Sequence, residues 1–216
     1  MTSSPRTSLS VSVRRHFVDT FFTSHASLLE GRKVIDLGGK KQNKRGLFDL
    51  GRYASDITYV NIDRTTEPDI VADAAAVPLP DASCDAIVLG EVLEHVPEPI
   101  AVLMEAHRLL RTGGQVLATV PFIYPVHADP YDFGRYTEYY WQKAAEKAGF
   151  GAIMIERQGG FFAVLALMVQ HFFRAKKVSW RPVQLPLVRF CMWLDRGTTA
   201  LLFRDWTTGY GLVFTK

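Results

Sequence analysis

Small and acidic residues recur just after short apolar runs in this sequence, where β-strands would end. The set consists of Asp36, Gly38, Gly39, Asp63, Asp73, Ala74, Gly90 and Glu91. Glycines after a strand let the backbone approach a bulky ligand closely. An acid after a second strand can accept two hydrogen bonds from a ribose diol, and an acid beside an alanine can accept from the amine of an adenine. Each residue alone is typical of a loop or a helix cap, but the regular placement of the whole set indicates a nucleoside-containing ligand.

A second group of ionisable side chains lies in a segment rich in tyrosine and proline, from residue 121 to 141. His127 is the candidate general base, because the unperturbed pKa of histidine lies near neutrality. Asp129 can orient His127 or replace it as the base; alternatively, both side chains pin the segment by hydrogen bonds. Arg135 can bind an acidic group of a substrate or an aspartate of its own segment. The candidates for substrate binding are Tyr131, Arg135 and Tyr136.

Apolar spacing predicts the elements that position these residues. Short apolar runs predict strands over 33–37, 58–63, 69–73, 86–89, 115–120, 153–156 and 209–215. Helical spacing predicts helices over 11–29, 100–110 and 137–148, with a helical turn at 47–53. Thr137 is the predicted cap of its helix, and the TGG at 112–114 is a helix stop. Strands that alternate with helices are typical of a doubly wound, parallel α/β sheet, which binds ligands at the carboxyl ends of its strands.

The composition is that of one globular domain in a reducing compartment. The chain has 216 residues, of which 48% are apolar. Cys84 and Cys191 lie far apart and form no CxxC pair, so we predict neither a disulfide framework nor a metal site. We expect no signal peptide, because VSVRRHFVDTFF carries charges where an apolar run would lie. These features favour a cytoplasmic protein.

The C-terminal part of the chain carries positive charge among long apolar runs. Residues 151–216 hold nine Lys and Arg against three Asp and Glu, whereas residues 1–150 hold 16 against 19. The apolar run 161–173 is too short to span a bilayer, which takes about 20 residues. Core packing, a homodimer face, and an anchor lying on an anionic membrane surface are the alternatives for this part. The apolar context disfavours nucleic acid as a partner.

Four stretches give the sequence a family resemblance. They are VIDLGG at 34–39, YVNID at 59–63, DIVADAAAVPLPDASCDAIVLGEVLEHVPEP at 69–99 and EAHRLLRTGGQVLATVPF at 105–122. With these stretches the chain resembles the class I S-adenosylmethionine-dependent methyltransferases of the small-molecule and glycan type (methyltransferase type 11). The resemblance implies a Rossmann-like, mostly parallel seven-stranded sheet with helices on both faces. The implied parts are a cofactor-binding core at 1–160, a helical insertion at 161–206 and a last strand at 207–216.

The resemblance also implies roles for the strand-end residues. Asp36, Gly38 and Gly39 would flank the methionine part of S-adenosylmethionine, Asp63 would hold the ribose hydroxyls, Asp73 and Ala74 would meet the adenine, and Gly90 and Glu91 would lie near the sulfonium. For His95, in the turn that follows, we favour a structural role. Lys40 and Lys41 occupy the space of the family's usual third glycine. We interpret residues 40–45 as a solvated connecting loop, although one lysine can serve the cofactor's carboxylate.

The expected activity is methyl transfer to a hydroxyl of a sugar, including a lipid-linked saccharide, or of another small molecule. PYDFGRYT at 130–137 resembles a subset of the family, many members of which are encoded with bacterial cell-surface glycan functions. One alternative is a cofactor-binding module without turnover, suggested by the altered glycine loop. Another is a protein or nucleic-acid methyltransferase, but GEVLEH stands where such an enzyme has an Asn/Asp-Pro-Pro-aromatic tetrad. A dehydrogenase is disfavoured because the chain lacks the G-x-G-x-x-G that binds a pyrophosphate.

Overall fold

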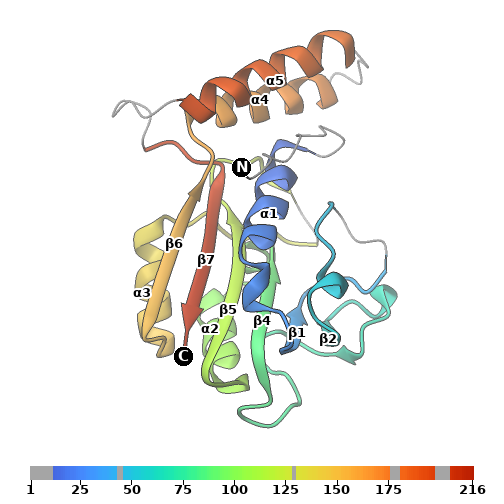
Figure 1. The fold of residues 1–216 in the computed structure, drawn as a ribbon, viewed down its shortest axis with the longest axis vertical. Coiled ribbons are helices and arrows are strands. Elements are labelled where there is room, and N and C mark those ends of the chain that lie inside the picture. The colour runs from blue at the N-terminus through green and yellow to red at the C-terminus, as the bar shows by residue number, and fades with distance from the viewer. Residues whose placement is uncertain (1–11, 43–45, 128–129, 176–180, 198–204) are drawn as a thin grey trace.

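Seven strands form one sheet in the order β3–β2–β1–β4–β5–β7–β6. The computed structural model describes residues 12–42, 46–127, 130–175, 181–197 and 205–216 (Figure 1). The strands are β1 (Lys33–Leu37), β2 (Asp56–Asn61), β3 (Ile70–Val71), β4 (Cys84–Gly90), β5 (Leu110–Pro121), β6 (Ala152–Gln158) and β7 (Gly209–Thr215). Neighbours from β3 to β5 pair in parallel, and β7 runs antiparallel to both β5 and β6. This arrangement confirms the predicted Rossmann-like, mostly parallel sheet.

Helices cover both faces of the sheet. The α-helices are α1 (Val13–Ser24), α2 (Pro99–Leu109), α3 (Glu138–Ala148), α4 (Phe161–Ala175) and α5 (Arg181–Gly197), and the 3₁₀ turns are η1 (Ala26–Leu28), η2 (Leu50–Arg52), η3 (Arg64–Thr66) and η4 (Leu93–His95). In Figure 1, α1 lies in front of the sheet and α2 and α3 lie behind it. The alternation of side chains along a strand supplies both cores. In β1, Val34 joins the cluster packed on α1, and Ile35 joins the cluster packed on α2 and α3.

The structure corrects the predicted start of the fifth strand and the predicted capping bond of Thr137. The predicted fifth strand began at Gln115 after a glycine stop, but β5 begins at Leu110 and includes both glycines. Gly113 adopts a φ of +78°, and its amide donates to the carbonyl of Lys216, so tertiary pairing extends the strand. Thr137 precedes α3 in an extended conformation, but its side chain makes no capping hydrogen bond.

The helices α4 and α5 pack together between β6 and β7 in the chain. Figure 1 shows them across the end of the sheet where the parallel strands finish. Asp195 of α5 caps the start of α4, because its carboxylate accepts the amides of Gly160 at 2.9 Å and Ala163 at 3.0 Å. In the described part of the chain, every helix is too short or too polar to cross a membrane. The domain boundaries at 160 and 206 stay a prediction.

Candidate functional site

The loop after β1 is closely packed against two neighbouring strands. Gly38 has a φ of +82°, which L-residues rarely adopt, and its amide donates to the carbonyl of Val60 at 2.7 Å. A Cβ on Gly38 would lie 2.6 Å from the side chain of Val92. A Cβ on Gly39 would overlap the carboxylate of Asp36. Position 38 therefore requires glycine, and a side chain at position 39 would displace the carboxylate of Asp36. The loop lies directly against the segment that follows β4.

Asn61, the last residue of β2, fixes this loop. Its side-chain amide donates to the carbonyls of Gly38 at 2.9 Å and Gly39 at 3.0 Å. Its Oδ1 accepts the amide of Asp63 at 2.9 Å. Asn61 is buried, so these bonds lie away from solvent. One side chain thus couples the glycine loop to the acid that follows β2.

The two acids after β2 and β3 are exposed at the same edge of the sheet. Oδ1 of Asp63 accepts the amide and the hydroxyl of Thr65. These hydrogen bonds hold the pKa of Asp63 below its usual range. Asp73 accepts the amide of Ala75 in a similar turn, and Ala74 packs against the core. Both carboxylates are therefore positioned by their own turns and face solvent.

The cationic loop after the glycines folds towards the β2–β3 connection. Lys41 forms an ion pair with Asp69 at 2.6 Å, which raises the pKa of Lys41. Next to it, Gln42 donates to Glu67 at 2.7 Å. Lys40 lies close enough to contribute to the lowered pKa of Asp63. Residues 43–45 lie outside the described residues. Lys41 is thus committed to a surface partner, which agrees with a connecting role for the part of the loop that is described.

The segment after β4 begins with a buried ion pair. Glu91 follows Gly90 in a left-handed conformation, with a φ of 59°. Its carboxylate accepts Nε of Arg14 at 2.9 Å and Nη2 at 2.6 Å, and Nη1 of Arg14 donates to Gln158. Burial raises the pKa of Glu91, but the guanidinium of Arg14 outweighs burial and the net pKa is lowered. Helix α1 is therefore fastened to the end of β4 through a charged pair.

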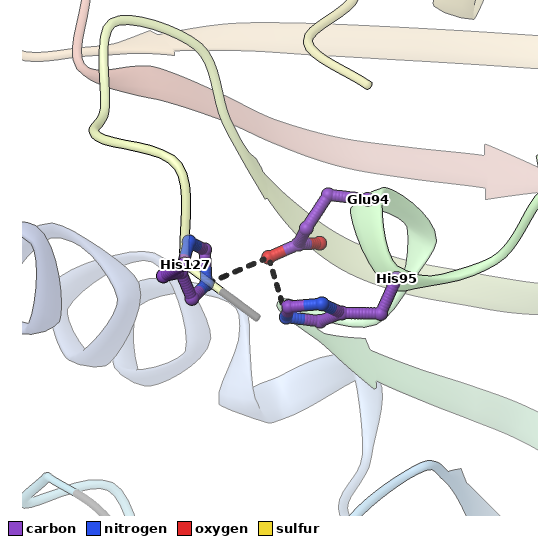
Figure 2. A group of neighbouring side chains, drawn as sticks. All are labelled: Glu94, His95 and His127. Atoms are coloured by element: carbon purple, nitrogen blue, oxygen red, sulfur yellow. Dashed lines mark ion pairs between the residues drawn. The ribbon is translucent and has the colours of Figure 1, made fainter. Parts of the chain in front are cut away.

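Three residues later, a second buried carboxylate faces two histidines (Figure 2). Glu94 has an exposed fraction of 1%. Its Oε1 lies 3.6 Å from Nε2 of His95 and 3.9 Å from Nε2 of His127. Burial raises the pKa of Glu94 well above its usual range, and the nearby Glu91 adds to this rise. Burial is the main cause of the lowered pKa of His127, and the nearby His95 lowers this pKa further.

The segment that carries His127 is held by an aspartate–arginine pair. Asp132 accepts both terminal nitrogens of Arg135, at 2.5 and 2.7 Å, and the backbone amide of His127 at 2.8 Å. These contacts lower the pKa of Asp132 to about 2, with Arg135 the main cause. Of the two roles that the sequence allows for Arg135, the contact with an aspartate of its own segment is therefore present.

Aromatic rings link this cluster to α4. The ring of Tyr124 lies edge-on to His127, at a centroid distance of 5.1 Å, and edge-on to His171 of α4, at 5.3 Å. The helical pair that follows β6 thus contacts the polar cluster that follows β4 and β5.

Comparisons with known proteins find a methyltransferase domain within the chain. Residues 44–118 match the family model described as a methyltransferase domain. The fold matches the crystal structure of an S-adenosylmethionine-dependent methyltransferase from Archaeoglobus fulgidus with a TM-score of 0.60, over 94% of each chain at 17% identity. The matched domain and the fold support the class I S-adenosylmethionine-dependent methyltransferase family for this chain.

Curated methyltransferases match part of the chain. The ubiquinone/menaquinone biosynthesis C-methyltransferase UbiE of Caulobacter vibrioides is 34% identical over 93 residues, which cover 40% of this chain and 37% of the relative. The protein of the same name from Xanthomonas campestris is 30% identical over 112 residues, 44% of each chain. The chain thus spans about two fifths of the length of these relatives.

A further solved structure shares the fold of this chain. Phosphoethanolamine N-methyltransferase 2 of Haemonchus contortus, in complex with S-adenosyl-L-methionine, has a TM-score of 0.58 at 13% identity. The match covers 93% of this chain and 52% of that one. At this identity the likeness concerns the fold.

The structure gathers some of the predicted methyltransferase residues and separates others. His127 and Arg135 lie together, beside Glu94. Tyr136 stacks on Tyr140 at 4.1 Å, on the α3 side, and Tyr131 is 65% exposed. Asp129 lies outside the described residues. The catalytic and substrate-binding roles of these side chains stay predictions.

Three buried residues of the candidate site were not predicted from the sequence. Asn61 and Glu94 could have been found in the motifs YVNID and LEHV, because each is a polar residue next to an apolar run. Arg14 gave no such signal, because it lies 77 residues from its partner Glu91.

Proposed function

We propose that this chain transfers a methyl group from S-adenosylmethionine to a hydroxyl of a small molecule or sugar. One observation carries the proposal: the glycine loop after β1 and the buried cluster of Glu94 and His127 meet at one edge of the sheet. Val92 connects them, since it packs on Gly38 and lies two residues before Glu94. Ligands of parallel sheets bind at this edge.

The residues present fit the cofactor. Gly38 is required by its backbone conformation and its packing on Val92, and Gly39 leaves room for the carboxylate of Asp36. Among the described residues, Oδ2 of Asp63 accepts no hydrogen bond. When bound, S-adenosylmethionine supplies a methyl group that its sulfonium has already activated. Asp63 would bind the ribose hydroxyls, Asp73 and Ala74 the adenine, and Asp36 the methionine part.

The polar cluster fits an acceptor that must lose a proton. A hydroxyl becomes nucleophilic only when a positioned group takes its proton. The imidazole of His127 and the carboxylate of Glu94 lie next to each other, and Asp132 holds the backbone of His127 in place. His127 thus orients the hydroxyl and receives its proton, while Tyr124 and α4 cover the cluster.

A carbon acceptor is the second candidate. It is favoured by the curated relatives, which are named C-methyltransferases. Incubation with S-adenosylmethionine and either saccharide hydroxyls or hydroxylated aromatic rings, followed by NMR of the product, separates an O-methyl from a C-methyl group. A C-methyl product would replace the hydroxyl proposal.

Cofactor binding tests the core of the proposal. Titration calorimetry should show one S-adenosylmethionine per chain for the wild type. Asp63→Ala should weaken binding about tenfold or more, because a charge-assisted hydrogen bond is lost. Lys41→Ala is the matched control in the same region and should bind like the wild type, since Lys41 pairs with Asp69. A wild-type protein that binds no cofactor would disprove the proposal.

We further propose that the acceptor is lipid-linked and that α4 and α5 rest on the inner face of the membrane. Each helix has an exposed apolar stripe. The stripes consist of Leu165, Met168 and Phe172 on α4 and of Leu187, Phe190 and Trp193 on α5. The exposed cations Arg174, Arg189 and Arg196 lie on the same two helices and suit anionic headgroups.

Flotation with anionic phosphatidylglycerol vesicles tests the membrane contact. The wild type should float with the vesicles at low salt, and Phe190→Ser/Trp193→Ser should lower the bound fraction about tenfold, because two apolar side chains are lost from the interface. Tyr139→Ser, which changes a ring that is 73% exposed on α3, is the control and should float normally. Wild-type protein that stays below the vesicles contradicts the proposal.

A further inference from the structure

The carboxylate of Glu94 is buried without a partner. Its exposed fraction is 1%, and neither Oε1 nor Oε2 accepts a hydrogen bond in the described structure. A buried carboxylate is costly unless a cation or hydrogen-bond donors compensate it. The arginine of the same segment, Arg135, is already engaged with Asp132. The ionised form of Glu94 therefore needs another positive partner.

Both histidines present the same ring atom to Glu94. Nδ1 of His95 lies 2.6 Å from the carbonyl of Tyr131, and Nδ1 of His127 lies 3.3 Å from the carbonyl of Pro125. A carbonyl only accepts, so each Nδ1 carries the proton in these contacts and each Nε2 carries a lone pair. In this tautomer, each Nε2 presents a lone pair to the ionised carboxylate of Glu94. Figure 2 joins these two ring nitrogens to Glu94 by dashed lines.

Arg135 does not change this assignment. Its Nη2 lies 3.3 Å from Nδ1 of His127, but the same nitrogen donates to Asp132 at 2.7 Å and to the carbonyl of Pro125 at 3.2 Å. A guanidinium nitrogen of this kind has two protons, and these two acceptors use both. Nδ1 of His127 thus keeps its own proton.

We propose that Glu94, His95 and His127 bind a divalent transition-metal ion such as Zn²⁺ or Mn²⁺. The three ligand atoms lie within 4.8 Å of one another. A bound ion with ligand bonds near 2.1 Å would bring them to roughly 3 Å, which takes small side-chain rotations. Two imidazoles and one carboxylate are a common ligand set for such ions. The contacts of both Nδ1 atoms with carbonyls are the outer hydrogen bonds that orient metal-binding histidines. The cysteine spacing predicted no metal site, and this proposal departs from that prediction.

In the proposed reaction the ion would activate the acceptor hydroxyl. This part of the inference rests on the proposed function. Three protein ligands leave coordination positions open, and a hydroxyl bound there loses its proton more easily. His127 would then hold the ion in place of acting as the base, and the proton of the hydroxyl, whose pKa the ion would lower, would pass to solvent water. The expected acceptor is then a molecule with a hydroxyl, or a pair of adjacent hydroxyls, that can coordinate a metal ion.

Metal binding can be measured without turnover. When Mn²⁺ is added to metal-stripped protein, the electron paramagnetic resonance signal of free Mn²⁺ should disappear until one ion is bound per chain. Zn²⁺ should compete with Mn²⁺ for this site. Glu94→Gln and His127→Asn should each weaken binding about tenfold or more, since even loss of an outer-shell partner costs this much. His171→Asn is the matched control, because His171 touches the same Tyr124 but is no ligand, and it should bind Mn²⁺ like the wild type.

Thermal unfolding supplies the second readout. Zn²⁺ should raise the melting temperature of the wild type and of His171→Asn, but not of Glu94→Gln. A wild type that binds no Mn²⁺ and gains no stability from Zn²⁺ overturns the proposal, as does a Glu94→Gln variant that binds like the wild type. Calorimetry with S-adenosylmethionine on the same samples distinguishes failure of the metal site from failure of the proposed function. Protein that binds the cofactor but no metal contradicts only the metal site. Protein that binds metal but no cofactor contradicts only the proposed function.

Discussion

Replacing Arg14 with methionine should lower the free energy of unfolding by about 3–5 kcal/mol, because the change leaves a buried charge unpaired. The exposed fraction of Arg14 is 3%, and its guanidinium makes three hydrogen bonds, two to Glu91 and one to Gln158. Methionine keeps the length of the side chain and removes the charge. Urea denaturation followed by circular dichroism measures the loss.

Two comparisons isolate the charge. Arg14→Met/Glu91→Met should recover most of the lost stability, since replacing both members of a buried pair with apolar residues is often neutral. Arg15→Met, in the next position of α1, should cost about 1 kcal/mol or less. A double variant as unstable as Arg14→Met would show that the loss comes from packing and not from the unpaired carboxylate.

The pH dependence has a definite sign. In the wild type the pKa of Glu91 is lowered, so Glu91 contributes stability above its unfolded pKa and loses it as the pH falls through the folded pKa. Without Arg14, burial becomes the dominant influence, opposed by the smaller effect of Arg15, and should raise the pKa of Glu91 above its unfolded value. The deficit of Arg14→Met should therefore be smaller at about pH 5 than at about pH 8.

Replacing Asn61 with leucine should lower the free energy of unfolding by about 3 kcal/mol and weaken S-adenosylmethionine binding about tenfold or more. The change removes two donors from the carbonyls of Gly38 and Gly39 and one acceptor from the amide of Asp63. Both ends of the proposed cofactor site then lose their common support. Urea denaturation and titration calorimetry measure the two effects.

Gln42→Ala is the control for Asn61. Gln42 is an amide of the same loop, but it is exposed and donates to Glu67 at the surface. Its replacement should change stability by about 0.5 kcal/mol or less. Normal cofactor affinity in Asn61→Leu would mean that the glycine loop holds its shape without the β2 residue.

The order of strands and helices could be predicted because it depends on local periodicity. The apolar runs around Val34 and Ile87 fill opposite faces of a sheet in any βαβ arrangement, so their placement needed no tertiary information. The start of β5 could not be predicted in this way. Gly113 joins the strand through a contact with Lys216, about 100 residues away in the chain, and such pairing overrides the local glycine signal.

The same difference between local and long-range information applies to the residues of the candidate site. Asp63 and Asp73 could be predicted, because the carboxyl ends of parallel strands meet at one edge. The approach of His127 to Glu94 depends on how two long loops fold over that edge, and no spacing in the sequence encodes it. For the same reason the alternatives for Arg135 stayed open until its contact with Asp132 was known.

The position of β7 has a consequence for biosynthesis. This strand follows α4 and α5 in the chain, yet it lies between β5 and β6, and β6 pairs with no other strand of the described sheet. While the chain emerges from the ribosome, β6 and one edge of β5 therefore stay unpaired until residues 209–215 appear. Pairs such as Leu117 with Val213 join distant parts of the chain, which makes this closure a late and slow event. The nascent protein must protect an open sheet edge and an apolar helical pair at the same time, so we expect it to depend on chaperones during translation.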